Sequence, residues 1–297
     1  MSDLVVVGTD GSVPSLNAVS MAAREAAWRG ARLRVVHAFG WPEVHYPTGG
    51  SPLLCTDNDM RALTDPLLAR ATECARRAAP GVSVSRDVVV GDALKILVEQ
   101  SSHAQLMVVG SRGAGAFAAL LVGSRSVGLA AHARCPVLVV RGEPDPSAPV
   151  LLGLDGSPAA REAVAFAFDE AALRGTGLVA LHAWTTWNVP VPSPPQDPTA
   201  PYTYGRGVLA ADEERLLAEA LAGCAERYPQ VRVEQRSVRA ATRQTLVTES
   251  NKAQLLVVGA RGRGGLTGLL LGSVSQAVLH HAHCPVAVVR NTGPHQH

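Results

Sequence analysis

Short apolar runs recur along the chain, each followed by a turn and then by a longer stretch with helical spacing. The first run, 4–8, is Leu-Val-Val-Val-Gly, and its length and β-branched side chains are typical of a buried strand. An Asp-Gly-Ser turn follows, and Pro14 can open a helix that continues through several alanines toward Gly30. Because strand and helix patterns keep alternating, the sequence predicts an α/β fold with a parallel sheet.

The same alternation can be followed through both halves of the chain. Two long segments without a pattern interrupt it. Segment 40–59 is expected to be a surface loop, whereas the proline-rich 185–205 could be a nucleotide lid or an unconstrained surface loop. Strands are expected at 4–8, 32–39, 82–90, 106–109, 136–141, 150–154, 178–184, 231–238, 255–258 and 286–289, and helices at 14–30, 60–79, 92–103, 124–133, 158–174, 208–227, 242–252 and 276–283.

Two glycine-rich loops have identical spacing in identical context. Gly110-x2-Gly113-x9-Gly123-Ser124 follows one apolar run, and Gly259-x2-Gly262-x9-Gly272-Ser273 follows another 149 residues later. His-Ala-x-Cys-Pro-Val recurs with the same offset at 132–137 and 281–286, whereas Asp-Gly-Ser at 10–12 and 155–157 and His-Ala at 37–38 and 182–183 recur with an offset of 145. The chain is therefore interpreted as a tandem repeat, with domains at 1–142 and 149–291.

A glycine loop between a strand and a helix start is suited to holding phosphate. Glycine lets the backbone approach an anion closely, and unpaired amides at the helix N-terminus face it. Alternating strands and helices also predict a doubly wound, Rossmann-like sheet in each half, with ligands bound beyond the carboxyl ends of the strands. Asp10, Ala38 and the Gly110 loop all follow strands, so we expect them to meet in one crevice.

Composition limits the other functional classes. The chain has 297 residues, 47% of them hydrophobic and 4% aromatic, which suits aliphatic cores in two domains. A net charge of +2 gives no ground for a nucleic-acid partner, and no apolar run reaches the roughly 18 residues of a membrane span. The first residues lead directly into a strand, which leaves no room for a signal peptide, and the five cysteines, an odd number, favour reduced thiols in a cytoplasmic protein.

With these motifs, the chain resembles a tandem universal stress protein of the ATP-binding kind. The resemblance implies a five-stranded parallel sheet in each half, ATP with Mg²⁺ as ligands, and internal pairing through the last strand of each half, with a homo-oligomer possible. It implies Asp10 and Asp155 at the ribose, phosphates or metal, and backbone of Ala38 and Ala183 at the adenine. The remaining implied binding residues are Gly8, Gly110, Ser111, Arg112, Gly113, Ala114, Gly115, Ala116, Gly123 and Ser124 in the first half, and Gly153, Gly259, Ala260, Arg261, Gly262, Arg263, Gly264, Gly265, Gly272, Ser273, Val274 and Ser275 in the second.

Two sequence differences within the repeat distinguish the halves. Arg125 follows Gly123-Ser124, where the second half has Val274, and Gly91-Asp92 becomes Ala240-Ala241. Either change could weaken one site. Neither loop is a Walker A motif, because the Gly-Lys-[Ser/Thr] sequence is absent.

Each candidate residue also has a structural interpretation. Asp10 and Asp155 could be turn residues, and His37 and His182 are expected to satisfy backbone or loop groups. Cys135 and Cys284 are expected to be buried small hydrophobes. The cluster around His280, His281 and Cys284 suggests zinc, but adjacent histidines at a helix end seldom point to one metal, so a helix-terminal role is favoured for the histidines.

Three functions remain open. The first is a nucleotide-binding stress or dormancy protein that signals through conformation or partners, without being an enzyme. The second is a slow ATP-hydrolysing or phosphotransfer enzyme on the same fold. The third is a dimerisation module with vestigial loops, against which the intact spacing in both halves argues.

Overall fold

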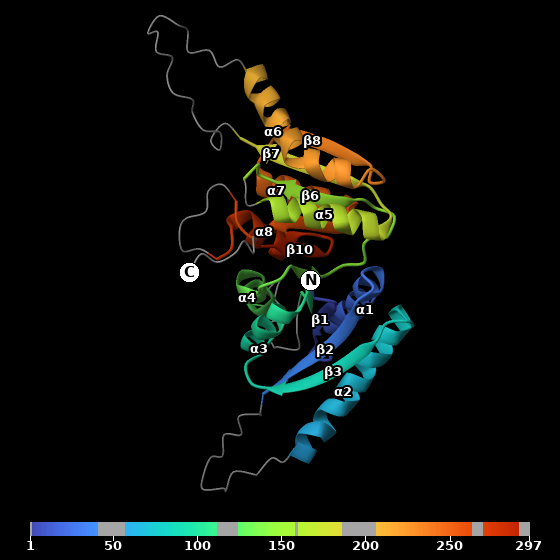
Figure 1. The fold of residues 1–297 in the computed structure, drawn as a ribbon. Coiled ribbons are helices and arrows are strands. Elements are labelled where there is room, and N and C mark those ends of the chain that lie inside the picture. The colour runs from blue at the N-terminus through green and yellow to red at the C-terminus, as the bar shows by residue number, and fades with distance from the viewer. Residues whose placement is uncertain are drawn as a thin grey trace, which may run out of the picture. The chain divides into compact units, whose positions relative to one another are not determined.

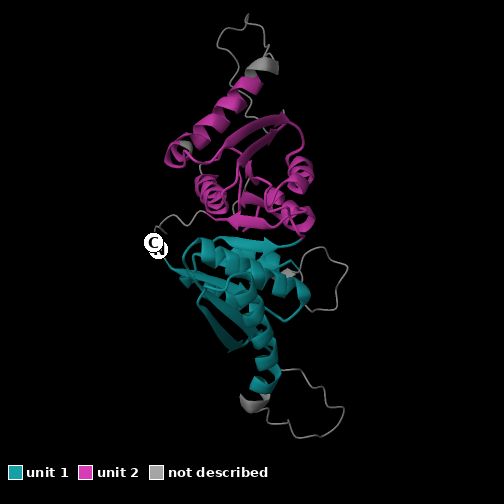
Figure 2. Ribbon diagram, turned by 90° about the vertical axis from the view of Figure 1, so that its right-hand side faces the viewer, with its two compact units in different colours: residues 1–141 teal, residues 142–297 magenta. Residues whose placement is uncertain are grey.

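The chain forms two compact units, Met1–Arg141 and Gly142–His297, shown in teal and magenta in Figure 2. The computed structural model describes residues 2–40, 57–111, 124–157, 160–185, 206–262 and 270–290. Each unit contains one copy of the sequence repeat.

Unit 1 is a five-stranded parallel sheet in the order β3-β2-β1-β4-β5. Helices α1 and α2 contact each other, as do α3 and α4, and the two pairs cover opposite faces of the sheet (Figure 1). The chain reverses its direction of travel across the sheet between β1 and β4, as in a doubly wound fold. The elements are β1 (Leu4–Gly8), α1 (Val13–Trp28), β2 (Arg32–Phe39), α2 (Asp57–Ala78), β3 (Val84–Val90), α3 (Ala93–Gln100), β4 (Leu106–Gly110), α4 (Ser124–His132) and β5 (Val137–Val140).

Unit 2 repeats this topology in the order β8-β7-β6-β9-β10. Its helices pair in the same way, α5 with α6 and α7 with α8. The elements are β6 (Val150–Leu154), α5 (Arg161–Arg174), β7 (Leu178–Trp184), α6 (Arg206–Arg227), β8 (Val233–Arg239), α7 (Thr242–Glu249), β9 (Leu255–Gly259), α8 (Ser273–His281) and β10 (Val286–Val289). The predicted fold class, two tandem doubly wound five-stranded parallel sheets, is confirmed.

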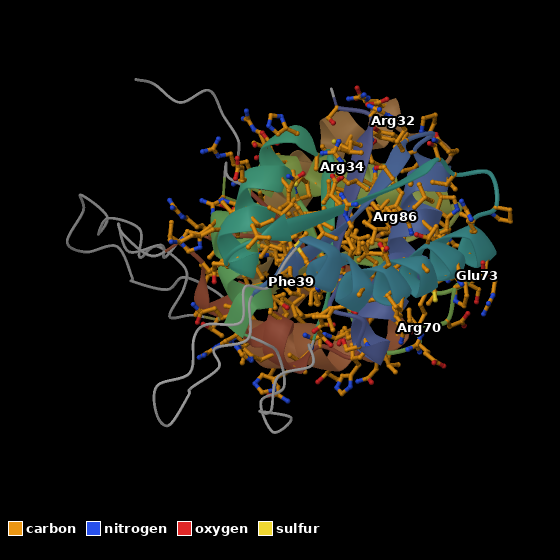
Figure 3. All side chains as sticks on the ribbon, turned by 90° about the horizontal axis from the view of Figure 1, so that it is seen from below. Arg32, Arg34, Phe39, Arg70, Glu73 and Arg86 are labelled. Carbon is orange, nitrogen blue, oxygen red and sulfur yellow. The ribbon has the colours of Figure 1, made fainter. Side chains whose placement is uncertain are left out.

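The central strands form the core because they are covered on both faces. Val5, Val6 and Val7 of β1 are completely buried, which explains why the strand is an unbroken apolar run and does not alternate. The outer strands differ: none of the residues of β3 is buried, and the strand carries the exposed Arg86 and the partly exposed Asp87. Arg34 Nε of β2 lies 3.5 Å from the Asp87 carboxylate, and Figure 3 shows Arg34 and Arg86 on these strands. Such charges discourage edge-to-edge pairing with another chain.

Several helix boundaries differ from the prediction. Helix α2 begins at Asp57, inside the segment predicted as loop, and α8 begins at Ser273, three residues before the predicted start. The α3 and α7 helices end at Gln100 and Glu249, and each is followed by a short 3₁₀ turn where a continuous helix was predicted. Side chains cap two of the helices at their N-termini: Ser12 accepts from Ser15 N and Asp92 from Lys95 N.

None of the helices that the structure describes is long and apolar enough to cross a bilayer.

Candidate functional site

The Asp-Gly-Ser turns and the glycine loops leave adjacent strands in each unit. Strand β1 pairs with β4 and β6 pairs with β9, and the helices that follow these strands lie on opposite faces. This is the switch point of a doubly wound sheet, where ligands of such folds bind. The strand topology therefore brings together the two motifs that the sequence analysis singled out.

Each Asp-Gly-Ser segment is a tight turn whose carboxylate bonds to its own backbone. Asp10 Oδ1 accepts from Ser12 N at 3.1 Å and from Ser12 Oγ at 2.6 Å, and Asp155 Oδ1 accepts from Ser157 N at 2.9 Å. The glycine between the aspartate and the serine of each turn has a left-handed backbone, with φ of 77° at Gly11 and 69° at Gly156. The turn interpretation is confirmed, and it also fixes the direction in which each carboxylate points.

In unit 2 the Asp155 carboxylate lies directly against the glycine loop. A Cβ at Gly262 would lie nearer than 3.0 Å to Asp155 Oδ2, a distance that real Cβ atoms do not show. Residue 262 must therefore lack a side chain as long as Asp155 keeps this position. This contact joins residues of two separate motifs into one site.

The first amide of each loop belongs to the sheet. Ser111 N donates to Val140 O at 2.9 Å, and Ala260 N donates to Val289 O at 2.7 Å. Gly272 N in turn donates to Ala260 O at 2.7 Å. The N–H groups of Ser111, Ala260 and Gly272 therefore already have acceptors, so these three amides are not free for phosphate, and the other contacts expected of these residues stay predictions.

Ser275 also has a structural partner. Its side chain is buried, and its hydroxyl donates to Gly259 O at 2.7 Å and lies 3.3 Å from Ala260 O. Ser126 makes the matching bond to Gly110 O at 3.0 Å in unit 1. The hydroxyl of Ser275 therefore anchors the helix start to the loop, since its one proton is donated to the backbone, and a phosphate contact of this residue stays a prediction. The 149-residue offset pointed to Ser126, which the sequence analysis missed.

The amides at the start of α8 have no acceptors within the helix. An α-helix leaves its first N–H groups without partners, and these carry the positive end of the helix dipole. Gly272 is the N-cap and makes no side-chain cap, so Ser273 and Val274 begin the helix with backbone donors only. This terminus is therefore suited to an anion, as the sequence predicts.

The two predicted site glycines on β1 and β6 are explained by packing. A Cβ at Gly8 would lie 2.9 Å from Leu97 Cδ1, and one at Gly153 would lie 3.0 Å from Leu246. Both glycines therefore make room for side chains of α3 and α7, and their place beside a ligand stays a prediction. Gly110 is required for the same reason, because a Cβ there would lie 2.8 Å from Pro14 O of α1.

The region near Ala38 and Ala183 differs between the units. Gly91 follows β3 with a φ of 141°, whereas the matching Ala240 has no left-handed backbone. Thr242 Oγ1 also donates to Ala183 O at 2.8 Å, while Ala93 stands at the matching position of unit 1. The sequence difference between Gly91 and Ala240 thus changes the backbone path beside the expected adenine site.

A buried His–Glu pair in unit 2 was not predicted. His182 Nδ1 lies 2.9 Å from Leu154 O, and Nε2 lies 2.6 Å from Glu213 Oε2. The first-half residue His37 makes the matching bond to Thr9 O at 2.8 Å, which confirms the expected backbone role of both histidines. The position matching Glu213 is Thr64, whose hydroxyl donates to Met60 O, so this helix position supplies no carboxylate to His37.

The cysteines near the repeated endings are structural. Cys135 and Cys284 are both buried, as predicted, and burial raises the pKa of Cys135 to about 12. Among the described residues, no three His, Cys, Asp or Glu side chains form a group that could hold a metal ion. His132 Nδ1 lies 2.8 Å from Gly128 O at the end of α4, which agrees with a helix-terminal role.

Part of the predicted site lies outside the described residues. Ser124 and Ser273 begin α4 and α8, and Arg261 is exposed after β9. The predicted site residues that lie outside the described ranges are Arg112, Gly113, Ala114, Gly115, Ala116, Gly123, Arg263, Gly264 and Gly265.

The model of the universal stress protein family matches residues 1–141 and again 147–290. The chain belongs to the universal stress protein family. Universal stress protein Rv2005c of Mycobacterium tuberculosis is 42% identical over 302 residues, covering 97% of each chain, and Universal stress protein Rv2623 of the same organism is 41% identical over 298 residues, covering 97% of this chain and 96% of the relative. A universal stress protein from Archaeoglobus fulgidus has the same fold, with a TM-score of 0.71 and 20% identity over 98% of this chain and 99% of that one.

Proposed function

We propose that each half of the chain binds ATP, with the phosphates at the glycine loop and the start of the following helix. The observation that carries this proposal is the contact between Asp155 and Gly262, where a carboxylate lies against the loop at the switch point of the sheet and leaves no room for a Cβ unless one of the two shifts. The intact loop spacing in unit 1 extends the proposal to the first half.

One carboxylate in each half fits a magnesium ion that accompanies the phosphates. Mg²⁺ beside nucleotide phosphates commonly takes one or two protein carboxylates, and waters and phosphate oxygens complete its coordination. Asp10 and Asp155 are each held by their own turn, so little rearrangement is needed to present the carboxylate. When bound, the ion would neutralise phosphate charge next to that carboxylate.

ATP is proposed to act as a held ligand in a cytoplasmic stress or dormancy response, read out through conformation or partners. Slow hydrolysis is the second candidate, since the same aspartates could orient a water. A turnover assay with purified chain separates the two candidates. Sustained phosphate release that Asp155→Asn abolishes would support an enzyme.

Thermal unfolding in the presence of nucleotides tests the proposal directly. A ligand at about 100 times its dissociation constant stabilises the native state by about 2.7 kcal/mol when it does not bind the unfolded chain. ATP with Mg²⁺ is expected to raise Tm clearly, and AMP to raise it less because AMP lacks the outer phosphates. Equal shifts from ATP and AMP would argue against a phosphate-binding loop.

A further inference from the structure

Arg290 is the residue that follows the last strand of unit 2, and the backbone places it beside the glycine loop. Val289 of β10 is in register with Gly259 of β9, and Ala260 N donates to Val289 O at 2.7 Å. Ala260 O accepts from Gly272 N, the N-cap of α8, also at 2.7 Å. The end of β10, the start of the loop and the start of α8 therefore meet around Ala260.

Two guanidinium groups share this corner. Arg261 follows Ala260 directly, and Arg290 follows its hydrogen-bonding partner Val289. Burial lowers the pKa of Arg290, and the positive charge of Arg261 lowers it further, so the two like charges are close enough to repel each other. Within the described part of the chain, neither arginine makes an ion pair or a side-chain hydrogen bond.

Like charges held together without a counter-charge favour binding of an anion. The dipole of α8 adds positive potential at the same corner, because the first helical amides lack acceptors. A partly buried guanidinium forms bidentate, charge-assisted bonds with phosphate oxygens. The only carboxylate established beside the described part of this loop, Asp155, contacts Gly262, where a magnesium ion is proposed.

We propose that Arg290, together with Arg261, binds the outer phosphates of the nucleotide in the second half. This inference rests on the proposed ATP site and assigns to it a residue from outside both sequence motifs. The assignment predicts that Arg290 discriminates between nucleotides by their phosphate number and has no effect on the nucleoside part. Arg141 occupies the matching position after β5, beside the bond from Ser111 N to Val140 O.

Calorimetric titration of the full chain with ATP, AMP and inorganic tripolyphosphate tests the inference. Arg290→Gln is expected to weaken ATP and tripolyphosphate at one of the two sites by about tenfold or more, about 1.4 kcal/mol. AMP affinity is expected to change less than about twofold, and Arg290→Lys to recover part of the loss by restoring the charge. Arg232→Gln is the matched control, because it removes an exposed positive charge from the opposite edge of the same sheet.

The outcomes separate this inference from the proposed function. Arg290→Gln with unchanged ATP and tripolyphosphate affinity overturns it, as does an equal loss for AMP and ATP. A similar loss in Arg232→Gln also overturns it, because the effect would then reflect net charge. If the wild-type chain binds tripolyphosphate in an Arg290-dependent way but not ATP, the phosphate site stands and the ATP proposal falls; if it binds neither, both fall.

Discussion

At the scale of single residues, the site depends on the absence of a side chain at Gly262. The loop backbone meets the Asp155 carboxylate there, and the Asp155 turn prevents that carboxylate from moving freely, because Oδ1 is bonded to Ser157 N. A methyl group must therefore displace either the loop or the aspartate. The glycine serves the geometry of the site more than the stability of the fold, since residue 262 is exposed.

Gly262→Ala is expected to weaken ATP binding in the second half by about tenfold or more, because a shift in the carboxylate disturbs metal and phosphate together. Stability should change by no more than about 1 kcal/mol, as for most exposed substitutions. Calorimetric titration and urea unfolding measure the two effects. Gly223→Ala is the matched control: its new methyl group points into open space on α6, so ATP affinity should remain at the wild-type value. An unchanged ATP affinity in Gly262→Ala would show that the contact is irrelevant to the ligand.

Cys135 is expected to resist alkylation in the native protein because its thiol is buried and its pKa is about 12. The unfolded thiol ionises near pH 9, so the preference for the protonated form stabilises the native state below that pH and is lost as the pH rises toward 12. Mass mapping after iodoacetamide treatment at pH 8 should show Cys74, which is partly exposed, labelled well before Cys135. Equal labelling of both thiols in folded protein would contradict this burial.

At the scale of elements, a buried His–Glu contact joins β7 to α6 in unit 2, and Thr64 stands at the matching helix position of unit 1. His182 of β7 donates through Nδ1 to Leu154 O, since a carbonyl can only accept, and its Nε2 shares one proton with Glu213 of α6. Both side chains are nearly inaccessible to water, so each depends on the other for a partner. The pair fixes α6 to the sheet immediately before Ala183, the expected adenine contact.

Glu213→Ala is expected to destabilise the protein by about 3 kcal/mol, because His182 Nε2 is left buried without its partner. Glu213→Gln should lose much less, since the amide can donate to a neutral imidazole. Urea unfolding at pH 7 measures both variants, with Thr64→Ala as the control at the matching position of unit 1. Equal losses in the alanine and glutamine variants would show that side-chain volume alone matters at position 213.

Gly223→Ala is expected to stabilise unit 2 by roughly 0.5–1 kcal/mol, because glycine in a helix interior is less favourable than alanine by about that amount. The new methyl group meets no atom within 4 Å, so no strain opposes the gain. The midpoint of urea unfolding should rise. A fall in the midpoint would indicate that α6 is not a regular helix at this position.

The elements themselves could be predicted because their signals are local. Valine runs identify the buried strands, and Pro14 identifies the start of a helix. The hydrogen-bond partners of individual polar groups could not be predicted from local sequence. The Ala260 amide is taken by β10, and the His182–Glu213 bond joins residues 31 positions apart, so both depend on tertiary packing. The packing role of Gly8 could not be predicted either, because nothing in its own segment indicates that Leu97 fills the space beside it.

At the scale of the whole molecule, duplication has produced two similar but unequal units. They share the strand order, the Asp-Gly-Ser turn and the buried serine that anchors the loop. They differ at Gly91 and Ala240, where the backbone conformation changes, and at Arg125 and Val274 at the start of the last helix. Equal affinity at both sites is therefore not expected.

We predict two ATP molecules per chain with different affinities. Gly113→Val and Gly262→Val should each remove one site, so titration of the single-site variants isolates the two affinities. Arg125→Val should alter only the site that remains in Gly262→Val. A wild-type stoichiometry of one, or identical affinities in the two single-site variants, would contradict the prediction.

The segment that joins the units is held by the second unit through Gln254. This side chain is buried, and its Nε2 donates to Pro146 O at 2.9 Å and to Ala148 O at 2.6 Å, while its Oε1 accepts from Arg174 at 2.9 Å. A gene fragment that begins at Pro149 would express a half whose interior amide has lost both acceptors, at a cost of about 1–3 kcal/mol. Dividing the chain before Asp145 keeps those acceptors, so the choice of cleavage point decides whether the second half can be isolated as a stable protein.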